Sequence, residues 1–323
     1  MERSGAAEPG AVTRRLTLST ALRVLVSLAL LAGLVYFAHR THAWDALRRA
    51  DLVMVAGGFC CYLTGQLIAA RRWYLLLLHS GFQPRFREVL RANTIGVYAG
   101  NFVPGVAGGD LFRPILLFGP KTTKKPQLYA SVLFERLGGL VATLLLASVG
   151  AAWFALTHRD LHFVTVAGFV LLLIVALLAA AYAIRHVHLA ALPRINAWLD
   201  HVREGSHHLL RYVGSPKSVL MVLLYSLAFQ ACNIGMLWCF LDSLDPIPSP
   251  FAVVLAAPLA WLASMAPVSL NGLGVREGTL MVVLTQLGLP QAQVAGAALL
   301  GLLPLLLVSS LGALWSLALF DRN

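Results

Sequence analysis

Charged side chains are scarce in this chain of 323 residues, in which Asp, Glu, Lys and Arg together make up 12%. In soluble globular domains that share is about 25%. Hydrophobic residues instead make up 59% of the chain, and its mean hydropathy is +0.76. This composition excludes a soluble globule. It indicates an all-α polytopic membrane protein, because helices satisfy their own backbone hydrogen bonds in lipid.

Negative charge is the scarcer sign, with 14 Asp and Glu against 25 Lys and Arg and a formal net charge of +11. The basic residues stand mainly between the apolar runs. Basic loops of a membrane protein suit the surface of an anionic leaflet. No segment combines a polar basic face with interleaved aromatic residues, so we expect membrane lipids as partners and no nucleic acid.

Cysteine is also sparse, and its spacing excludes a disulfide framework. The four cysteines all lie in apolar runs and form no Cys-x-x-Cys pair: Cys60, Cys61, Cys232 and Cys239. We interpret them as small residues of the core. His158 and His162 are spaced as metal ligands can be, but no third His or Cys stands near them. No Walker loop or Ser-His-Asp order is present. We therefore expect no metal, no cofactor and no use of ATP by this chain.

The apolar runs predict six full spans, at about 19–38, 52–78, 127–156, 163–184, 218–241 and 291–320. Residues 1–18 are polar and predict a cytoplasmic tail, so residues 19–323 form one integral-membrane domain. Its first half covers about 19–184 and its second half 218–323. Between them, residues 185–217 carry apolar side chains at helical spacing among basic ones. This predicts an amphipathic helix on an anionic leaflet, with a solvated linker as the alternative.

Two further apolar segments, about 93–118 and 251–287, are interrupted by Pro and clustered Gly. The interruptions share one pattern, in which Pro is followed five positions later by Gly and nine positions later by Arg: Pro104, Gly109 and Arg113, then Pro267, Gly272 and Arg276. A broken helix is tolerated at membrane depth only where it is buried in protein or lines a wet cavity. Matching breaks in two halves are a pointer to a transporter site.

Charge beside the first break indicates how it crosses the membrane. Basic residues flank it on both sides, at 85–91 and at 121–125, and basic loops stay in the cytoplasm. The segment would then enter and leave by one face, as a re-entrant hairpin. The second broken segment starts and returns without basic residues, so we expect it to open from the other face. The sequence thus predicts six to eight transmembrane helices, with two re-entrant hairpins in an inverted repeat and both termini cytoplasmic.

Six ionisable side chains are expected inside the bundle. Arg113, Arg276 and Arg136 are the candidates for binding a lipid phosphate, because a guanidinium matches phosphate bidentately. Their expected partners are three carboxylates, namely Asp110, Glu135 and Glu277. Ion pairing that only locks the two halves together is the alternative.

Residues at and near the breaks complete the predicted site. Asn101, Asn271, Gly109 and Gly272 are expected to contact substrate, with helix capping as the other role of the two asparagines. Arg71 and Arg72, near the end of the second span, are expected to reach the headgroup interface, and the neighbouring Trp73 suggests an interfacial belt.

Four motifs in chain order carry a family resemblance: Arg72-Trp73; Asn101…Pro104…Gly108-Gly109-Asp110…Arg113; Glu135-Arg136; and Pro267…Gly272-Leu-Gly274-Val-Arg276-Glu277. The sequence resembles the flippase-like family also called the lysylphosphatidylglycerol synthase transmembrane region. Its best-known member is the multiple peptide resistance factor of bacteria. In larger members this region is joined to a soluble aminoacyl-transferase domain, which this sequence lacks. The resemblance therefore implies lipid translocation and no transferase activity.

The resulting hypothesis is an inner-membrane lipid flippase or transporter in a bacterial cell, moving an anionic-headgroup lipid or a lipid-linked precursor. One alternative is a membrane-embedded aminoacyl- or glycosyltransferase, with Glu135 or Glu277 as acid or base. Another is a non-transporting subunit that assembles with lipid- or glycan-biosynthesis enzymes.

Overall fold

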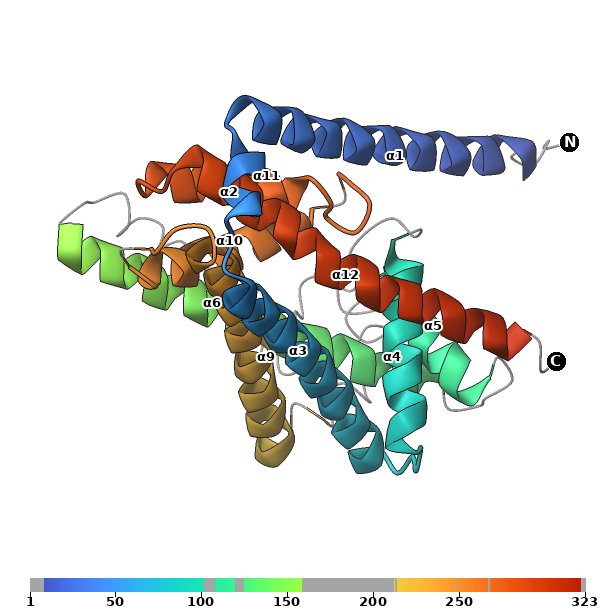
Figure 1. The fold of residues 1–323 in the computed structure, drawn as a ribbon. Helices are drawn as coiled ribbons and strands as arrows, with labels where there is room; N and C mark the ends of the chain where they lie inside the picture. The colour runs from blue at the N-terminus through green and yellow to red at the C-terminus, as the bar shows by residue number, and fades with distance from the viewer. Residues whose placement is uncertain are drawn as a thin grey trace, which may run out of the picture.

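The computed structural model describes residues 9–101, 108–119, 125–158, 212, 214–247, 249–266 and 268–320. Every regular element in these ranges is a helix (Figure 1). In chain order they are α1 (Pro9–Arg40), α2 (Ala43–Arg48), α3 (Leu52–His79), α4 (Phe86–Gly100), α5 (Gly108–Phe118), α6 (Lys125–His158), α9 (Pro216–Asp242), α10 (Phe251–Ser264), α11 (Val275–Gln286) and α12 (Gln291–Phe320).

Four of these helices, α3, α6, α9 and α12, are long and apolar enough to cross a membrane. They coincide with four of the six predicted spans, and α1 contains the first. The predicted span 163–184 and almost all of the predicted amphipathic segment 185–217 lie outside the described residues. α1 begins at Pro9, so residues 9–18 of the tail predicted for 1–18 are helix. Proline is well suited to a first helical turn, where its missing N–H has no partner to lose.

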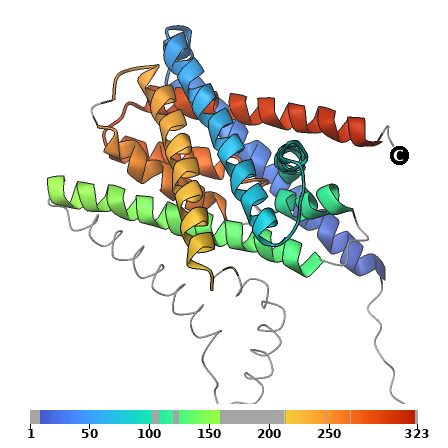
Figure 2. The same ribbon diagram turned by 90° about the horizontal axis from the view of Figure 1, so that it is seen from below.

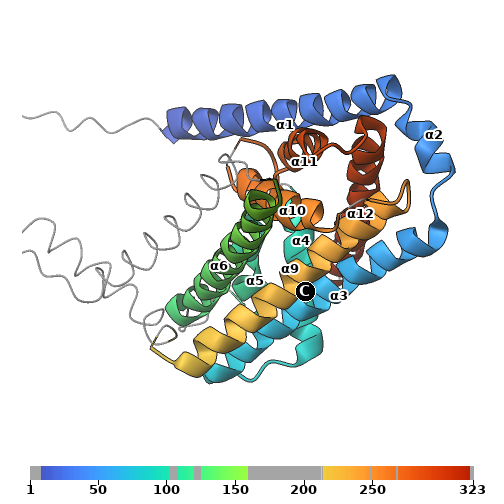
Figure 3. The same ribbon diagram turned by 90° about the vertical axis from the view of Figure 1, so that its left-hand side faces the viewer.

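α3 and α9 lie side by side at one edge of the bundle (Figures 2 and 3). Small residues bring the two helices together: a Cβ built on Gly58 would clash with the ring of Phe240, and one on Gly65 would touch Cys232. Membrane helices associate closely where small residues line their contact. Cys61 and Cys239 lie in the same contact, as predicted for core residues, whereas Cys60 is exposed.

Contacts between the ends of α3 and α9 define two ends of the bundle. At the first, called the Arg85 end, Ser80 after α3 meets the Tyr212 hydroxyl just before α9. Burial raises the pKa of Tyr212 to about 12, so this hydroxyl stays protonated. At the other, called the Asp242 end, the backbone N–H of Asp51 donates to the Ser243 carbonyl at 2.8 Å. α3 and α9 are therefore antiparallel.

Each broken segment forms a pair of short helices packed on each other, and both ends of each pair lie at one end of the bundle. The first hairpin is α4 and α5, where the ring of Phe118 packs on Phe82 at 4.8 Å, at the Arg85 end. The second hairpin is α10 and α11, where Phe251 stacks on Trp153 at 3.9 Å, at the Asp242 end. With 15, 11, 14 and 12 residues, none of the four helices reaches the roughly 30 Å of a hydrocarbon core.

Each hairpin packs on a long helix of the other half. α4 packs on α12, where a Cβ on Gly312 would lie 2.4 Å from the Thr94 carbonyl oxygen. α10 packs on α6 in the corresponding way, with Gly150 against the backbone of Leu255. A long helix of each half, α6 or α12, thus supports the hairpin of the other half, which places both breaks in the interior.

α1 lies across the second hairpin and α12 (Figure 3). The buried Ser27 hydroxyl accepts a hydrogen bond of 2.8 Å from the backbone N–H of Leu270, inside the second break. Leu30 packs directly on Gly274, which has φ +82 and could not carry a Cβ there without overlap. α1 therefore satisfies and covers part of the broken backbone.

Candidate anion-binding cavity

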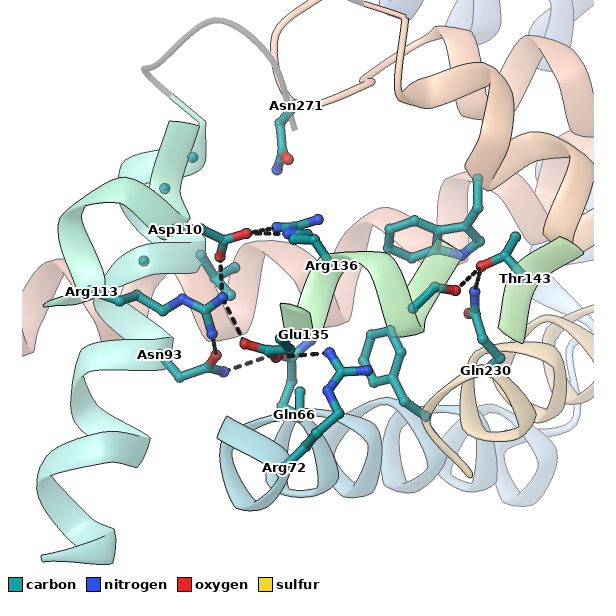
Figure 4. A pocket seen from close by; sticks show the side chains of 18 of the residues that line it. Gln66, Arg72, Asn93, Asp110, Arg113, Glu135, Arg136, Thr143, Gln230 and Asn271 are labelled. Carbon is teal, nitrogen blue, oxygen red and sulfur yellow. Dashed lines mark hydrogen bonds and ion pairs between the residues drawn. The ribbon is translucent and has the colours of Figure 1, made fainter. Parts of the chain in front are cut away.

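A cavity of about 190 Å³ lies between the two halves of the bundle (Figure 4). The first half contributes its charged and polar wall, chiefly Arg72, Asn93, Asp110, Arg113, Glu135 and Arg136. The second half contributes a mostly apolar wall that includes Phe229, Gln230, Trp261, Met265, Asn271 and Leu305. Polar groups on one side and apolar side chains on the other make the cavity amphipathic.

Glu135 on α6 joins two arginines from other helices. Its Oε1 accepts from Arg72 Nη2 of α3 at 2.7 Å, and its Oε2 accepts from Arg113 Nη2 of α5 at 3.3 Å. The residue is only 2% exposed. Because a carboxylate has two oxygens with free acceptor sites, it can hold both guanidinium groups at once. Glu135 thus takes the predicted position of an ion-pair partner.

Asp110 makes a second bridge at the start of α5. Its Oδ1 accepts from Arg113 Nη2 at 2.6 Å, one helical turn along the same helix. Its Oδ2 pairs with Arg136 of α6. Asp110 thus connects the first hairpin to α6, and it uses both oxygens to do so (Figure 4).

Neutral polar groups complete the cluster. Asn93 Oδ1 on α4 accepts from Arg113 Nη1 at 2.8 Å, and Ser226 Oγ on α9 accepts from Arg72 Nη1 at 2.7 Å. The guanidinium of Arg113 also lies over the ring of Trp73, 5.0 Å from its centroid. Even so, Arg72 Nε and Arg113 Nε are buried without a hydrogen-bond acceptor among the described residues.

The cluster carries a surplus of positive charge. Three arginines, Arg72, Arg113 and Arg136, stand against two carboxylates, Asp110 and Glu135, which leaves one positive charge among the described residues of the cavity wall. A wall with net positive charge attracts an anion, and the attraction is stronger in a low-dielectric interior than in water. No group of three or more His, Cys, Asp and Glu gathers as metal ligands within the described ranges.

The cluster lies nearer to the Arg85 end than to the Asp242 end. Arg72 is seven residues from the end of α3 at His79 and twenty from its start, or about 10 and 30 Å along the helix. Glu135 is ten residues from the start of α6 at Lys125, or about 15 Å. The charges are therefore inside the bundle, in the third of it next to Arg85 and Arg87.

Arg276 and Glu277 lie apart from this cluster. Arg276 Nη2 donates to Glu277 Oε1 at 2.6 Å, while Glu277 Oε2 accepts from the backbone N–H of Gly274 at 2.7 Å and caps α11. The pair borders a second cavity of about 30 Å³ together with Asn233 and Trp261. Arg113 and Arg276, which hold the same position in the two sequence patterns, therefore lie in two separate cavities of unequal size.

The two asparagines of the breaks contact each other. Asn271 Nδ2 donates to Asn101 Oδ1 at 2.9 Å, and Asn101 Nδ2 donates to Ser309 Oγ of α12 at 2.7 Å. The C-terminal end of α4 therefore meets the second break inside the bundle. Asn271 also faces the larger cavity (Figure 4). Both side chains thus join distant segments, and Asn101 is also the C-cap residue of α4.

The two predicted glycines have packing roles. A Cβ on Gly109 would lie 1.9 Å from the Gly96 carbonyl oxygen, so only glycine lets α5 approach α4 this closely. Gly109 lines the larger cavity as well. Gly272 has φ +72, packs against Ser264 and shapes the turn of the second break. Pro104 and Pro267 lie outside the described residues.

The interfacial prediction differs from the structure for Arg72 and Trp73. Both are buried, with Arg72 6% exposed and the Trp73 indole donating to Ser131 Oγ at 3.1 Å. Arg71 is exposed, and its guanidinium lies over the Tyr74 ring. Successive residues on a helix differ in direction by about 100°, so neighbours near a helix end can face opposite environments.

Sequence reasoning does not identify Asn93, Ser226 and Trp261 as site residues. One signal was available for the first. Asn93, Gly96 and Gly100 repeat at spacings of three and four, which puts a small and polar stripe on one face of α4, and all three line the cavity. Nothing in the local sequence distinguishes Ser226 or Trp261 from other residues of apolar helices.

The fold and this site define a polytopic helical membrane protein with a charged cavity inside its bundle. The family described as "Lysylphosphatidylglycerol synthase TM region" matches residues 22–312, and the chain therefore belongs to that family. A "UPF0104 membrane protein" of Methanothermobacter thermautotrophicus is similar to it, with 23% identity over 247 residues, which is 65% of this chain and 67% of that protein. The predicted family resemblance is confirmed, and with it a membrane protein of a lipid-related family.

Proposed function

We propose that this chain is a lipid flippase or transporter of a bacterial inner membrane. It moves a lipid with an anionic headgroup, or a lipid-linked precursor, between the leaflets. The observation that carries this proposal is the cluster of three arginines and two carboxylates around a cavity of about 190 Å³. Charge at membrane depth is costly and usually marks the path of a substrate or ion. Membership of a family named for lipid synthesis supports a lipid as that substrate.

The chemistry of the cluster favours a phosphate. A phosphodiester carries one negative charge, which balances the surplus charge of the cavity wall. Guanidinium groups bind phosphate oxygens through paired N–H donors. Arg136 offers the most accessible of the three, with a side chain 36% exposed, whereas those of Arg72 and Arg113 are 8% and 4% exposed. The apolar wall from the second half would accept the start of the acyl chains.

The proposed membrane arrangement is an inverted repeat with two re-entrant hairpins. The support is that each hairpin begins and ends at one end of the bundle, and the two ends are opposite. The exchange of α4 onto α12 and of α10 onto α6 is the pattern expected from an internal two-fold relation. α12 finishes at the Arg85 end, where Arg91 lies over the Trp315 ring. The proposal puts both termini on the cytoplasmic side.

Transport is favoured over catalysis by the contacts of the two candidate acids. Glu135 holds two arginines, and Glu277 holds Arg276 and caps a helix. A general acid or base must exchange a proton with a reacting group, and a carboxylate whose oxygens already accept from arginines is poorly placed to do so. The proposed protein is therefore not an enzyme and needs no cofactor. Lipid- or glycan-biosynthesis enzymes are its proposed partners.

The test is lipid translocation in proteoliposomes with fluorescent phosphatidylglycerol. We expect the wild type to flip the lipid. Arg136→Gln removes the most accessible guanidinium, and we expect it to slow flipping about tenfold, equivalent to about 1.4 kcal/mol. Arg71→Gln is the matched control, because Arg71 is exposed and stands outside the cavity wall.

Three results would count against the proposal. The wild type could fail to flip phosphatidylglycerol, phosphatidylethanolamine and a polyprenyl phosphate alike. Arg136→Gln and Arg71→Gln could slow flipping equally, which would remove the cavity from the path. A chemically modified lipid could accumulate in cells that express this chain alone, which would favour an enzyme.

A further inference from the structure

Trp261 on α10 lines both cavities of the bundle. On one side of it is the cavity with the charged cluster, and on the other side is the small cavity of Arg276, Glu277 and Asn233. Its indole ring packs edge-on against Phe229 of α9 at 6.4 Å between ring centroids. A single aromatic wall therefore separates two polar sites that belong to different halves.

The two cavities lie at different depths along the helices. The charged cluster is in the third of the bundle next to the Arg85 end. The smaller cavity lies toward the other end, since Asn233 is nine residues, or about 14 Å, from the end of α9 at Asp242. Ala297 is six residues, or about 9 Å, from the start of α12 at that same end.

Trp261 is at mid-depth between them. Its partner Phe229 is thirteen residues from either end of α9, or about 20 Å from both. Leu305, on the wall of the larger cavity, is similarly central in α12. A headgroup that travelled from the charged cluster toward Arg276 would meet the Trp261 ring at the middle of its path.

The helix that carries Trp261 has two features that allow this residue to move. Pro258 lies inside α10 and has no N–H to donate to the carbonyl of the preceding turn. Three residues after Trp261 the helix ends, and the second break follows from Met265 to Gly274. The turn that carries the indole is thus bounded by a missing hydrogen bond on one side and by broken helix on the other. Helices bend at such points.

We propose that Trp261 is the gate between the larger cavity with the charged cluster and the smaller cavity that Arg276 borders. This proposal rests on the proposed function, because it assigns the step in which a phosphate headgroup passes from the first half to the second. The closed position is the one in the structure. Opening requires the indole to move away from Phe229, so that the two cavities connect. The size of the ring then determines how often a headgroup passes.

A labelling experiment tests the gate without lipid transport. Asn233→Cys, in a background whose four native cysteines are replaced by serine or alanine, places a thiol in the small cavity. Sulfonatoethyl methanethiosulfonate, a small anionic thiol reagent, is added only at the Arg85 side of sealed vesicles. If the open state is populated below about 10%, the thiol reacts at least about tenfold faster in Trp261→Ala than with Trp261 present. Trp261→Phe should fall between them. Trp238→Ala is the matched control, because Trp238 is exposed and outside both cavities.

Equal labelling rates in three proteins, with Trp261 present, with Trp261→Ala and with Trp261→Phe, would overturn the gate. Acceleration in Trp238→Ala as large as in Trp261→Ala would overturn it too. Trp261→Phe keeps the test valid if the alanine variant fails to fold. Flipping by the same proteins then separates the two proposals. Faster labelling in Trp261→Ala without any lipid flipping supports the gate and contradicts the lipid substrate. Flipping that is unchanged by Trp261→Ala, with unchanged labelling, supports transport and contradicts the gate.

Discussion

Glu135 is the most deeply buried charged residue among those described in the cavity wall. It is 2% exposed and holds Arg72 and Arg113, which come from different helices. Glu135→Gln keeps the shape of the side chain but removes its charge, leaving two buried guanidinium groups with one carboxylate nearby. Breaking a buried ion pair from one side costs about 3–5 kcal/mol. We expect a large fall in the thermal unfolding temperature of the purified protein in detergent.

Asp45→Asn provides the control for this loss of a carboxylate. The Asp45 side chain is 59% exposed and pairs only loosely, with Arg48 at 3.9 Å. Exposed pairs contribute about 0–1 kcal/mol, so its unfolding temperature should stay close to that of the wild type. Equal unfolding temperatures for Glu135→Gln and Asp45→Asn would show that Glu135 does not hold the cluster together.

Asp110 competes with any anion for the arginines of the cavity. Its carboxylate occupies positions on Arg113 and Arg136 that a phosphate would use. Two like charges about 4 Å apart repel by about 4 kcal/mol at an effective dielectric constant of about 20. Asp110→Asn should therefore bind a short-chain phosphatidylglycerol at least about tenfold more tightly, equivalent to about 1.4 kcal/mol. Equilibrium binding in detergent measures this, and weaker binding by the variant would contradict an anion site at these arginines.

At the level of helices, the first hairpin depends on backbone contact between α4 and α5. A Cβ on Gly109 would lie 1.9 Å from the Gly96 carbonyl oxygen and 2.9 Å from the Gly100 nitrogen. Since both are backbone atoms, no rotamer change relieves the overlap. Gly109→Ala should destabilise the protein by about 1–3 kcal/mol, as overpacking does, and should shift Asp110 and Arg113 with α5.

Gly278→Ala is the control for Gly109→Ala. Gly278 lies in α11, and a Cβ there has no atom within 4 Å. Alanine is favoured over glycine in a helix by about 1 kcal/mol, so this change should be neutral or stabilising. Thermal unfolding of the two variants side by side checks the pair of predictions. A Gly109→Ala protein as stable as Gly278→Ala would show that α4 and α5 can separate at no cost.

α1 stabilises the second break through one hydrogen bond. Ser27→Ala leaves the Leu270 N–H in a partly buried position without its acceptor, which costs about 1–3 kcal/mol. Ser310→Ala is matched to it, because the Ser310 hydroxyl is exposed and bonds to Leu306 of its own helix. Hydrogen exchange at Leu270 should become faster in Ser27→Ala alone. Unchanged exchange there would mean that α1 does not hold the break.

The elements differ in how far the sequence predicts them. Long apolar runs determine α3, α6, α9 and α12, because burial in lipid leaves few alternatives to a helix. Pro and Gly locate both breaks, since they interrupt helices by their covalent geometry. The start of α1 at Pro9 escapes prediction, because Pro, Ala, Val and Leu there are compatible with helix and loop alike.

The charged cluster is predictable by residue type but only partly by partner. Asp110, Glu135 and Arg113 are expected to pair, because unpaired charge inside a membrane is too costly. Which helix face each residue occupies depends on packing between distant segments. For this reason the sequence suggests the interface for Arg72, although it reaches Glu135, 63 positions along the chain. The contact between Asn101 and Asn271, 170 positions apart, cannot be inferred from either motif alone.

For the molecule as a whole, the two halves share an arrangement of helices but not a charge distribution. Each has a long helix, a hairpin and a second long helix, and their hairpins exchange partners. Among the described residues of the two cavity walls, however, the surplus charge lies in the first half, while Arg276 of the second half is matched by Glu277. An anion is therefore attracted more strongly from the Arg85 end. Under the proposed transport function, this asymmetry predicts that the substrate enters preferentially from the Arg85 end.

The last prediction concerns how the whole chain crosses the membrane. Single cysteines at Arg87, in the first turn of α4, and at Pro126, after α5, mark the two ends of the first hairpin. Single cysteines at Asp245 and Gln291 mark the ends of the second, and all four positions are exposed. If both hairpins are re-entrant, a membrane-impermeant maleimide labels Arg87→Cys and Pro126→Cys from one side, and Asp245→Cys and Gln291→Cys from the other. The reason is geometric, since each hairpin starts and finishes at one end of the bundle.

The same labelling distinguishes the alternatives hairpin by hairpin. If the first hairpin crossed the membrane, Arg87→Cys and Pro126→Cys would react from opposite sides, against the positive charge of the loops on both its flanks. If the second crossed, Asp245→Cys and Gln291→Cys would do so. In the first case α4 and α5 would have to span the hydrocarbon core together as one broken helix. In the second case α10 and α11 would have to do so. Their lengths of 15 and 11, and of 14 and 12 residues, would allow this only if the two helices were stacked end to end. The helices of each pair instead lie against each other. We therefore expect the two cysteines of each hairpin to react from the same side, and the two hairpins to react from opposite sides.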